Sequence, residues 1–322
     1  MSKINTFMDF CSGIGGGRLG LEKAGLNCIA YSEIDKQAIK TYNFLYDNNE
    51  NNFGNLMNIN SAELPYFDLM IAGFPCQTFS VIGQRKGMND SRGQIIYGLI
   101  RILKEKSIPY FILENVKGLV NHNSGQTIKQ IINDLNDAGY SVRFKVLNSL
   151  HYGVPQMRER VYFVGVLKNL INTEKKFEWP LHIKQPKLNE YLIDNCEASL
   201  DLASFETFNR YLKNKYNNRK FILDELLKED YLVLDTRQSD LRLYRDKVPT
   251  LRTGRHGILY VRSGKFRKLS GYEALLLQGF PKSYADRVKN KISDKYLLCQ
   301  AGNAMTVSTI EAIGRKLVEY VG

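Results

Sequence analysis

The chain has 322 residues and a formal net charge of +12, from 45 Lys and Arg residues against 33 Asp and Glu residues. Its 43% hydrophobic and 24% charged residues indicate a globular protein and exclude a disordered chain, a collagen and a disulfide miniprotein. No apolar run approaches the roughly 18 residues of a membrane span. The five cysteines form no CxxC pair, which argues against structural zinc and fits a reducing cytoplasm.

The first 166 residues alternate between short apolar runs and amphipathic stretches. We expect strands at 4–10, 27–32, 67–72, 110–113, 143–147 and 161–166. We expect helices at 16–24, 36–46, 93–106 and 127–138. This alternation predicts an α/β fold with a doubly wound, mostly parallel sheet. Ligands of such folds bind at the carboxyl ends of the strands.

The alternation stops near residue 168, and helical patterns return only at 271–278 and 307–318. We therefore predict a smaller inserted domain over 168–265. The first domain then comprises 1–167 and 266–322.

A glycine-rich loop closes the first predicted strand, with the sequence DFCSGIGGG over residues 9–17. Its glycines allow the backbone to approach a ligand at the start of the next helix. Arg18 stands where GxGxxG requires glycine, which weakens a NAD or FAD assignment. Glu33 ends the second strand, where an acid can accept both hydroxyls of a ribose. The pattern favours a nucleoside site; the alternative is a tight turn beside a solvated glutamate.

Reactive side chains follow later strands of the predicted sheet. Cys76 lies in Gly73-Phe74-Pro75-Cys76, and a polar, glycine-containing loop continues to residue 93. A lone cysteine is most often an inert buried residue, but this strand-end position suits a nucleophile under a closing loop. Glu114 ends the next strand, and Arg158 and Arg160 precede another. Taken singly, these residues could be a capping acid and surface ion pairs.

The order of these segments resembles the DNA (cytosine-5) methyltransferase family, in its bacterial modification-type members. The matching segments are DFCSGIGGG, SEID, GFPCQ, DSRG, ENV, QMRER, RKLSGYEALLLQGFP and QAGNAM. The resemblance covers about 4–166 and 266–318. It implies a Rossmann-like methyltransferase domain that binds S-adenosylmethionine, with the insert as a target-recognition domain.

The resemblance also implies a covalent mechanism on a cytosine flipped out of duplex DNA. Cys76 would attack carbon 6 of the ring, and protonated Glu114 would donate to ring nitrogen 3. Arg158 would contact the carbonyl oxygen of the base, while Asn115 and Arg160 hold the group in place.

The implied methyl donor is S-adenosyl-L-methionine, and no metal is expected. Its predicted contacts are Phe10, Gly13, Ile14, Gly15, Gly16, Glu33, Ile34, Asn55, Leu56, Pro75, Ile95, Asn303 and Ala304. Cys11 departs from the family's usual Phe, so an aromatic contact is lost unless Phe10 compensates. Asn55 replaces the usual Asp, so its amide oxygen would accept from adenine without a full charge.

The end of the insert is strongly basic. Residues 232–268 hold ten Lys and Arg residues against three acids, a local net charge of +7. Arg and Gln can read guanine and adenine in the major groove, although a phosphate contact is equally open for any one arginine. The predicted DNA contacts are Ser80, Ile82, Arg85, Arg92, Arg237, Gln238, Ser239, Arg242, Arg252 and Arg255.

The leading hypothesis is a site-specific DNA cytosine-5 methyltransferase in the cytoplasm of a bacterium. We expect a monomer acting on double-stranded DNA; any cognate restriction endonuclease would act independently of it. Two alternatives remain: a tRNA cytosine-5 methyltransferase, and a catalytically inactive relative that only binds DNA.

Overall fold

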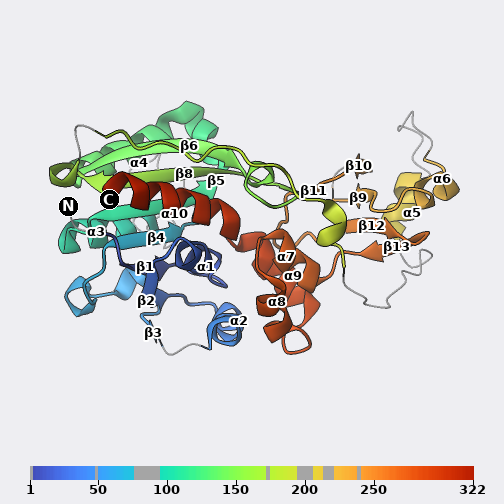
Figure 1. Cartoon of the computed structure of the whole chain (residues 1–322), viewed down its shortest axis with the longest axis horizontal. Coiled ribbons are helices and arrows are strands. Elements are labelled where there is room, and N and C mark those ends of the chain that lie inside the picture. The colour runs from blue at the N-terminus through green and yellow to red at the C-terminus, as the bar shows by residue number, and fades with distance from the viewer. Residues whose placement is uncertain are drawn as a thin grey trace. The chain divides into compact units, whose positions relative to one another are not determined.

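The structure is a computed structural model that describes residues 3–47, 50–75, 95–171, 175–193, 206–212, 221–237 and 241–322. Its main feature is a seven-stranded sheet in the order β3-β2-β1-β4-β5-β8-β6 (Figure 1). All neighbours pair in parallel except β8, which is antiparallel to both β5 and β6. The strands are β1 (Thr6–Phe10), β2 (Asn27–Ser32), β3 (Asn51–Asn52), β4 (Leu69–Gly73), β5 (Tyr110–Val116), β6 (Tyr140–Asn148) and β8 (Glu159–Leu167).

Helices cover both faces of this sheet, which confirms the doubly wound architecture. They are α1 (Gly16–Lys23), α2 (Lys36–Tyr46), α3 (Ile95–Lys106), α4 (Gln126–Asp137) and α10 (Val307–Val321). Alternate strand residues point to opposite faces. Met70 and Ala72 of β4 therefore join the buried core under α3 and α4, while Ile71 between them faces α1.

The pair formed by α1 and α10 depends on close backbone approach. A Cβ added at Gly20 would lie 2.6 Å from Ile310 Cβ, and one at Gly314 would lie 2.9 Å from Leu21 Cδ2. Because α10 is the last helix of the chain, the C-terminal residues complete the domain that the first residues begin. Of the segment predicted to return to the first domain, residues 304–322 belong to the first unit.

The chain divides into two compact units. The first comprises 1–148, 159–182 and 304–322, and the second comprises 149–158 and 183–303. These divisions differ from the predicted boundaries at 167/168 and 265/266. Residues 168–182 pack with the first unit, and residues 149–158 and 266–303 pack with the second. The expectation that 168–265 recognises the target is a statement about function and stays a prediction.

The second unit contains short strands that the sequence pattern did not reveal. Its four-stranded sheet has the order β10-β9-β12-β13, and β11 pairs in parallel with β7. The strands are β7 (Gln156–Met157), β9 (Val233–Asp235), β10 (Arg242–Tyr244), β11 (Val248–Pro249), β12 (Ile258–Arg262) and β13 (Lys265–Lys268). The helices are α5 (Glu206–Leu212), α6 (Leu223–Leu227), α7 (Gly271–Leu277), α8 (Lys282–Val288) and α9 (Asp294–Asn303).

Within the described ranges, none of the helices has the length and apolar character to cross a membrane.

Candidate active site and DNA-contact residues

The glycine-rich loop after β1 is held in a conformation that needs glycine at two positions. Gly13 and Gly15 have φ values of 55° and 76°, in the left-handed region that residues with a Cβ disfavour. Gly15 is the N-cap of α1, and its N–H donates to Ser12 O at 2.8 Å. A Cβ on Gly13 would meet no atom within 4 Å, so this part of the loop lies open beside the start of the helix.

Glu33 connects the loop to the end of β2. One carboxylate oxygen, Oε2, accepts the Gly13 N–H at 2.7 Å. The other, Oε1, accepts the N–H groups of Ile34 and Asp35 at 2.7 and 2.8 Å. Three of the roughly four acceptor positions of a carboxylate are therefore occupied by backbone groups. The remaining capacity lies on Oε2, on the side of the glycine loop.

The residues around this loop fit a nucleoside-type donor on three observations. The Ser12 Oγ atom is buried without a hydrogen-bond partner among the described residues. Ile34 exposes 67% of its surface, although it is a large aliphatic side chain directly after Glu33. Leu56 is buried, and Asn55 is exposed with its side-chain oxygen accepting the Met57 N–H at 3.0 Å. Polar groups on one side and apolar surface on the other suit a ribose and a base.

The other residues predicted to contact the methyl donor differ in burial and lie in both units. Phe10 is fully buried and packs against Phe67, with ring centroids 6.1 Å apart, so it does not reach the loop surface to offset Cys11. Ile14 is buried, Pro75 is exposed, and Ile95 is the first residue of α3. Asn303 ends α9 in the second unit, and Ala304 begins the returning segment of the first.

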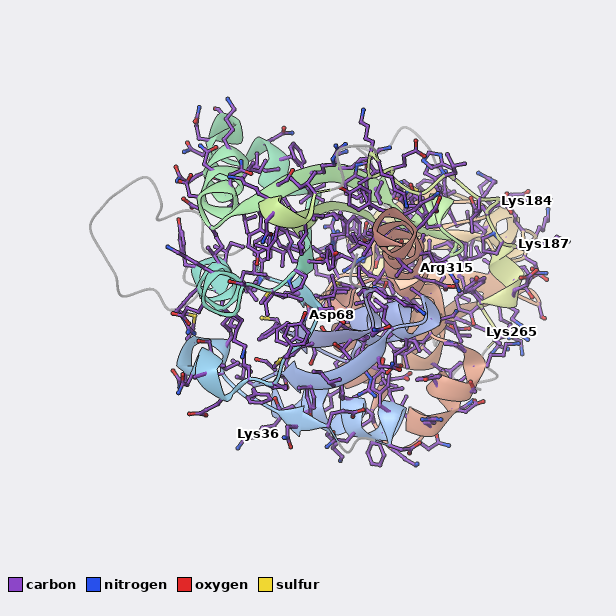
Figure 2. All side chains as sticks on the ribbon, turned by 60° about the vertical axis from the view of Figure 1, so that its left-hand side comes forward. Lys36, Asp68, Lys184, Lys187, Lys265 and Arg315 are labelled. Carbon is purple, nitrogen blue, oxygen red and sulfur yellow. The ribbon has the colours of Figure 1, made fainter. Side chains whose placement is uncertain are left out.

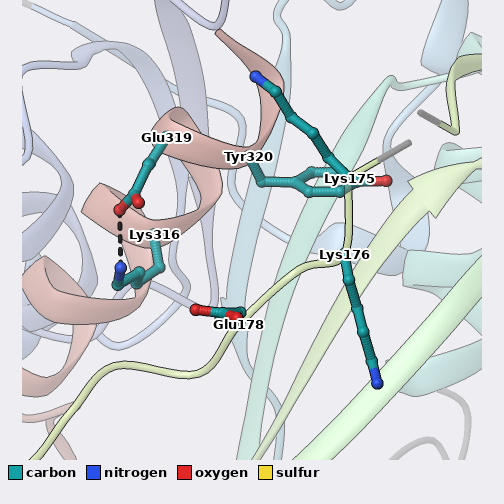
Figure 3. A pocket seen from close by; sticks show the side chains of 6 residues that line it. All are labelled: Lys175, Lys176, Glu178, Lys316, Glu319 and Tyr320. Atoms are coloured by element: carbon teal, nitrogen blue, oxygen red, sulfur yellow. Dashed lines mark hydrogen bonds and ion pairs between the residues drawn. The ribbon is translucent and has the colours of Figure 1, made fainter. Parts of the chain in front are cut away.

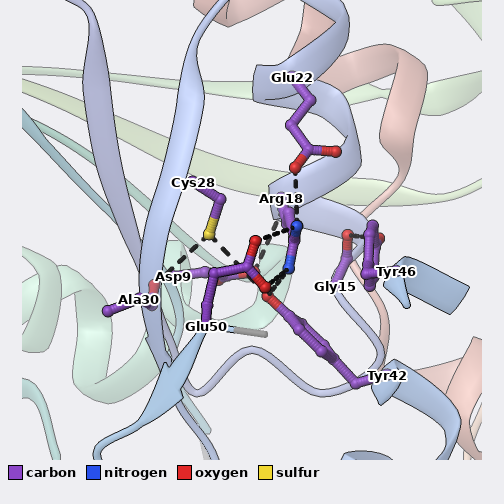
Figure 4. A network of polar contacts seen from close by, with 9 residues as sticks. All are labelled: Asp9, Gly15, Arg18, Glu22, Cys28, Ala30, Tyr42, Tyr46 and Glu50. Carbon is purple, nitrogen blue, oxygen red and sulfur yellow. Dashed lines mark hydrogen bonds and ion pairs between the residues drawn. The ribbon is translucent and has the colours of Figure 1, made fainter. Parts of the chain in front are cut away.

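Arg18, which does not fit a dinucleotide motif, supports the glycine loop through Tyr46 (Figure 4). Its guanidinium donates to Glu22 at 2.7 Å and to both carboxylate oxygens of Glu50 at 3.0 and 2.8 Å. It also lies 4.2 Å from the ring centroid of Tyr46, whose hydroxyl donates to Gly15 O at 2.5 Å. The network thereby fixes the carbonyl of Gly15 at the helix start.

Asp9 is a buried acid beside this network. Its Oδ2 accepts the Arg18 N–H at 3.2 Å, and its Oδ1 has no hydrogen-bond partner among the described residues. Burial raises the pKa of Asp9 to about 8, against the lowering effect of the Arg18 N–H and guanidinium. Asp9 is therefore largely protonated at neutral pH.

Met305 is a site residue that the sequence reading missed. A Cβ on Gly16 would lie 2.3 Å from Met305 O, and one on Gly17 would lie 2.5 Å from Met305 Cε. A Cβ on Gly73 would lie 3.6 Å from Met305 Cγ and also 3.6 Å from Glu114 Oε2. Met305 thus lies between the glycine loop and the end of β4. Its position directly after Asn303-Ala304 was the available signal.

The end of β5 brings three predicted residues together. Glu114 is 6% exposed, and the Arg160 Nε atom lies 3.1 Å from its Oε1. That oxygen makes no hydrogen bond of normal geometry with any described residue. Asn115 is 1% exposed, and its side-chain amide donates to Phe74 O at 2.9 Å. Asn115 therefore holds the backbone two residues before Cys76.

Several predicted residues lie outside the described ranges: Cys76, Ser80, Ile82, Arg85, Arg92, Gln238 and Ser239. Arg158 belongs to the second unit, in which it is 2% exposed. Its guanidinium donates to the carbonyl oxygens of Leu251 and Gly302 at 3.2 and 3.1 Å. The first unit accordingly joins Glu114, Asn115 and Arg160, and Arg158 is engaged within the second.

The predicted DNA contacts of the second unit differ in exposure. Arg242, Arg252 and Arg255 are exposed, as are Lys184, Lys187 and Lys265 of the same unit, which Figure 2 labels. Arg237 is not presented to solvent: its side chain is 3% exposed and pairs with Asp235. Reading a base with Arg237, as predicted, would first require breaking that buried pair.

A separate hollow in the first unit contains none of the predicted residues. It is lined by Lys175, Lys176, Glu178, Lys316, Glu319 and Tyr320 (Figure 3). Lys316 donates to Glu319 at 2.8 Å. The hollow has no nucleophile and no glycine loop, so it does not compete with the strand-end site.

Comparisons with known proteins agree with this geometry. Residues 5–319 match the family described as C-5 cytosine-specific DNA methylase. The chain is 32% identical over 319 residues to the type II methyltransferase M1.ScrFI of Lactococcus lactis subsp. cremoris, covering 98% of this chain and 78% of that relative. It is 34% identical over 315 residues to the type II methyltransferase M.NgoBI of Neisseria gonorrhoeae, with 95% and 90% covered.

The fold also has solved counterparts. The methyltransferase EhMeth of Entamoeba histolytica superposes with a TM-score of 0.70 at 19% identity, covering 99% of this chain and 98% of that one. The sheet and its glycine loop define a Rossmann-like methyltransferase, which confirms the predicted fold class. The chain belongs to the C-5 cytosine-specific DNA methylase family and is a DNA (cytosine-5) methyltransferase.

Proposed function

We propose that this enzyme methylates carbon 5 of one cytosine within a specific sequence of duplex DNA, with S-adenosylmethionine as the methyl donor. The observation that carries the proposal is a family match over nearly the whole chain, on a fold in which Glu114 of β5 pairs with Arg160 of β8. Type II methyltransferases among the relatives favour a modification enzyme of a bacterial restriction system. We further propose that it acts as a monomer in the cytoplasm, independently of any endonuclease.

The proposed nucleophile is Cys76. Carbon 5 of cytosine is too weak a nucleophile to accept a methyl group directly. Addition of the Cys76 thiolate to carbon 6 moves an electron pair of the ring toward carbon 5, which then attacks the methyl group. Methyl transfer breaks the bond from the sulfonium sulfur to the methyl group and leaves a neutral thioether. A base, a role that water can fill, then removes the carbon 5 proton, and departure of the thiolate restores the aromatic ring and the free enzyme.

Glu114 is the proposed proton donor to ring nitrogen 3. Addition of the thiolate places negative charge on the ring, and protonation at this nitrogen stabilises it. The Glu114 carboxyl has one buried oxygen without a hydrogen bond of normal geometry among the described residues, so it has capacity to meet a base. Arg160 positions this carboxyl, and Asn115 positions the backbone of Phe74 before the nucleophile. Arg158 would contact the carbonyl oxygen of the base.

The donor supplies an electrophilic methyl group on a sulfonium when it is bound. Glu33, Ile34 and Leu56 are the proposed ribose and adenine contacts, and the loop at Gly13 and Gly15 is the proposed support for the methionine end. The target ring can reach Cys76 only outside the base stack, so the cytosine must flip out of the duplex.

Bisulfite sequencing of a plasmid from a host that expresses the protein tests the proposal. We expect complete conversion protection at one cytosine of one short sequence and nowhere else. Transfer of radiolabelled methyl groups to purified duplex DNA and to tRNA gives the comparison. Methylation of tRNA alone would replace the proposed function with that of an RNA methyltransferase.

The covalent step has its own test. We expect Cys76→Ser to abolish methylation and retain sequence-specific DNA binding, and a duplex with 5-fluorocytosine at the target to trap the wild-type enzyme. The matched control is Cys28→Ser, because burial raises the pKa of the Cys28 thiol to about 12 and makes it unreactive. Full activity of the Cys76 variant would refute the covalent mechanism.

A further inference from the structure

Residues 250–257 of the second unit form a turn with two arginines opposite each other. Arg252 and Arg255 form an isolated antiparallel bridge, and the Arg255 N–H donates to Arg252 O at 3.4 Å. Gly254 between them has a φ of 69°, which glycine adopts without strain. Both arginines are exposed. We call residues 250–257 the recognition turn.

Two like charges directly opposite across an antiparallel bridge repel each other. Within the part of the chain that the structure describes, no acidic side chain forms an ion pair with Arg252 or Arg255. The arrangement therefore carries an electrostatic cost in the free protein, which a polyanion would remove on binding. This points to the recognition turn as a DNA-contacting element.

The base of the recognition turn is held through its backbone atoms. The Arg237 guanidinium donates to Thr250 O at 2.9 Å, and Gln156 Oε1 accepts the Leu251 N–H at 3.1 Å. At the other end, the N–H and Oγ1 of Thr236 both donate to Gly257 O at 2.9 Å. The turn is therefore fixed at both ends by residues of the same unit.

Arg237 is itself fixed by Asp235 at the end of β9. Its Nε and Nη2 atoms donate to the two carboxylate oxygens of Asp235 at 2.7 and 3.0 Å. The two side chains are 3% and 2% exposed. Nε and Nη2 thus bind the acid, and Nη1 binds the turn. All three nitrogen atoms of the guanidinium therefore bind protein groups. Buried ion pairs of this kind hold geometry more than they add stability.

We propose that Arg237 is a positioning residue that fixes the recognition turn, so that Arg252 and Arg255 together meet the DNA and set its sequence specificity. This inference rests on the proposed function, since it assigns roles in DNA recognition. It moves the base-reading role predicted for Arg237 to the two exposed arginines.

The test compares variants on the cognate duplex identified by bisulfite sequencing and on an unrelated duplex. Arg252→Ala and Arg255→Ala should each lower cognate affinity about 10- to 100-fold, as expected for a lost bidentate contact. Asp235→Asn and Arg237→Gln should lower the ratio of cognate to unrelated affinity by similar factors and raise KM for DNA. Both should leave kcat, S-adenosylmethionine affinity and the salt dependence of binding close to those of the wild type.

Asp235→Asn is the discriminating variant, because this buried acid cannot contact DNA. If it binds the cognate duplex as the wild type does while Arg237→Gln does not, Arg237 contacts DNA directly and the inference is wrong. If the wild type methylates no DNA, the proposed function fails instead, so the two failures are distinguishable.

A measurement on the wild-type protein does not depend on the variants folding. p-Hydroxyphenylglyoxal labels accessible arginines, which mass spectrometry locates. We expect label on Arg252 and Arg255 but not on Arg237 in the free enzyme, and protection of both by the cognate duplex. Labelling of Arg237 that the duplex blocks would overturn the inference.

Discussion

The two units each contain an arginine–carboxylate pair, and the pairs are made in opposite ways. In the first unit, Arg160 approaches Glu114 with one nitrogen at 3.1 Å, and the side chains are 12% and 9% exposed. In the second, Arg237 grips Asp235 with two nitrogens at 2.7 and 3.0 Å, at 3% and 2% exposure. An arginine and a carboxylate therefore form a loose pair, with one nitrogen, in the first unit and a complete pair, with two nitrogens, in the second.

This difference in ion-pair geometry matches the two proposed roles: Glu114 donates a proton, and Asp235 fixes a backbone segment through Arg237. A carboxyl that donates a proton to a base cannot have both oxygens committed to the protein. A carboxylate that fixes a backbone segment gains from full commitment, because its geometry then has one solution. The quality of an ion pair, rather than its presence, distinguishes the proposed catalytic acid from the positioning acid.

The largest expected effect is on catalysis at the loose pair. Glu114→Gln should lower kcat by about 10²- to 10⁴-fold, because an amide cannot donate the acidic proton to the ring. The thermal midpoint and donor affinity should change little. The matched control is Glu159→Gln, an exposed acid on the same strand as Arg160 that pairs with Lys117. Near-normal kcat in the Glu114 variant would show that Glu114 is not the catalytic acid.

The next prediction concerns the free energy of unfolding, which should drop most when the Arg237–Asp235 pair is broken. Arg237→Met leaves the Asp235 charge buried, which costs about 3–5 kcal/mol of unfolding free energy. Arg160→Met leaves an acid whose side chain is 9% exposed, against 2% for Asp235, so the loss should be smaller. Urea unfolding of both variants at one pH measures the two costs. Equal losses would mean that the two pairs differ in exposure but not in role.

The last prediction concerns the pH dependence of stability and Asp9, a buried acid with no ion-paired partner among the described residues. Its pKa is raised to about 8 in the fold, so the folded protein binds a proton that the unfolded chain releases above about 4. Its contribution to stability is complete below pH 4 and falls between pH 4 and 8, by at most about 1.4 kcal/mol per pH unit.

We expect Asp9→Asn to flatten this loss, measured as thermal midpoints from pH 5 to 8. Asp35→Asn is the control, because Asp35 is exposed and asparagine can also serve as the N-cap of α2. An Asp9 variant that keeps the wild-type slope would show that another group titrates.

Much of the first unit could be predicted from its apolar periodicity. The bounds of β2 and α2 agree with the predicted ranges 27–32 and 36–46. The strand β5 continues past its apolar run, because Glu114 and Asn115 still pair with Tyr162 and Val161 of β8. Polar residues at a strand end resemble a loop in sequence, so this extension was not predicted. The antiparallel direction of β8 was not predicted either.

The second unit and the finer site geometry could not be predicted this way. Its strands are two to five residues long, too short for alternation to stand out. Arg237 looked like a base reader because local positive charge does not reveal that Asp235, two residues earlier, would bury it. Glu33 directly follows β2, and Glu114 lies near the end of β5, so the strand pattern could indicate both positions, while their roles stay predictions.

The hydrogen bonds that hold the recognition turn at both ends have an evolutionary consequence. These hydrogen bonds are made to backbone groups: the carbonyl oxygens of Thr250 and Gly257 and the N–H of Leu251. Every amino acid has a backbone carbonyl, and every one except proline has a backbone N–H. Substitutions at Arg252, Thr253 and Arg255 can therefore change the presented side chains without loosening their support. If the recognition turn reads DNA as proposed, new target sequences would need changes in only a few codons, and the methyl-transfer residues would stay unchanged.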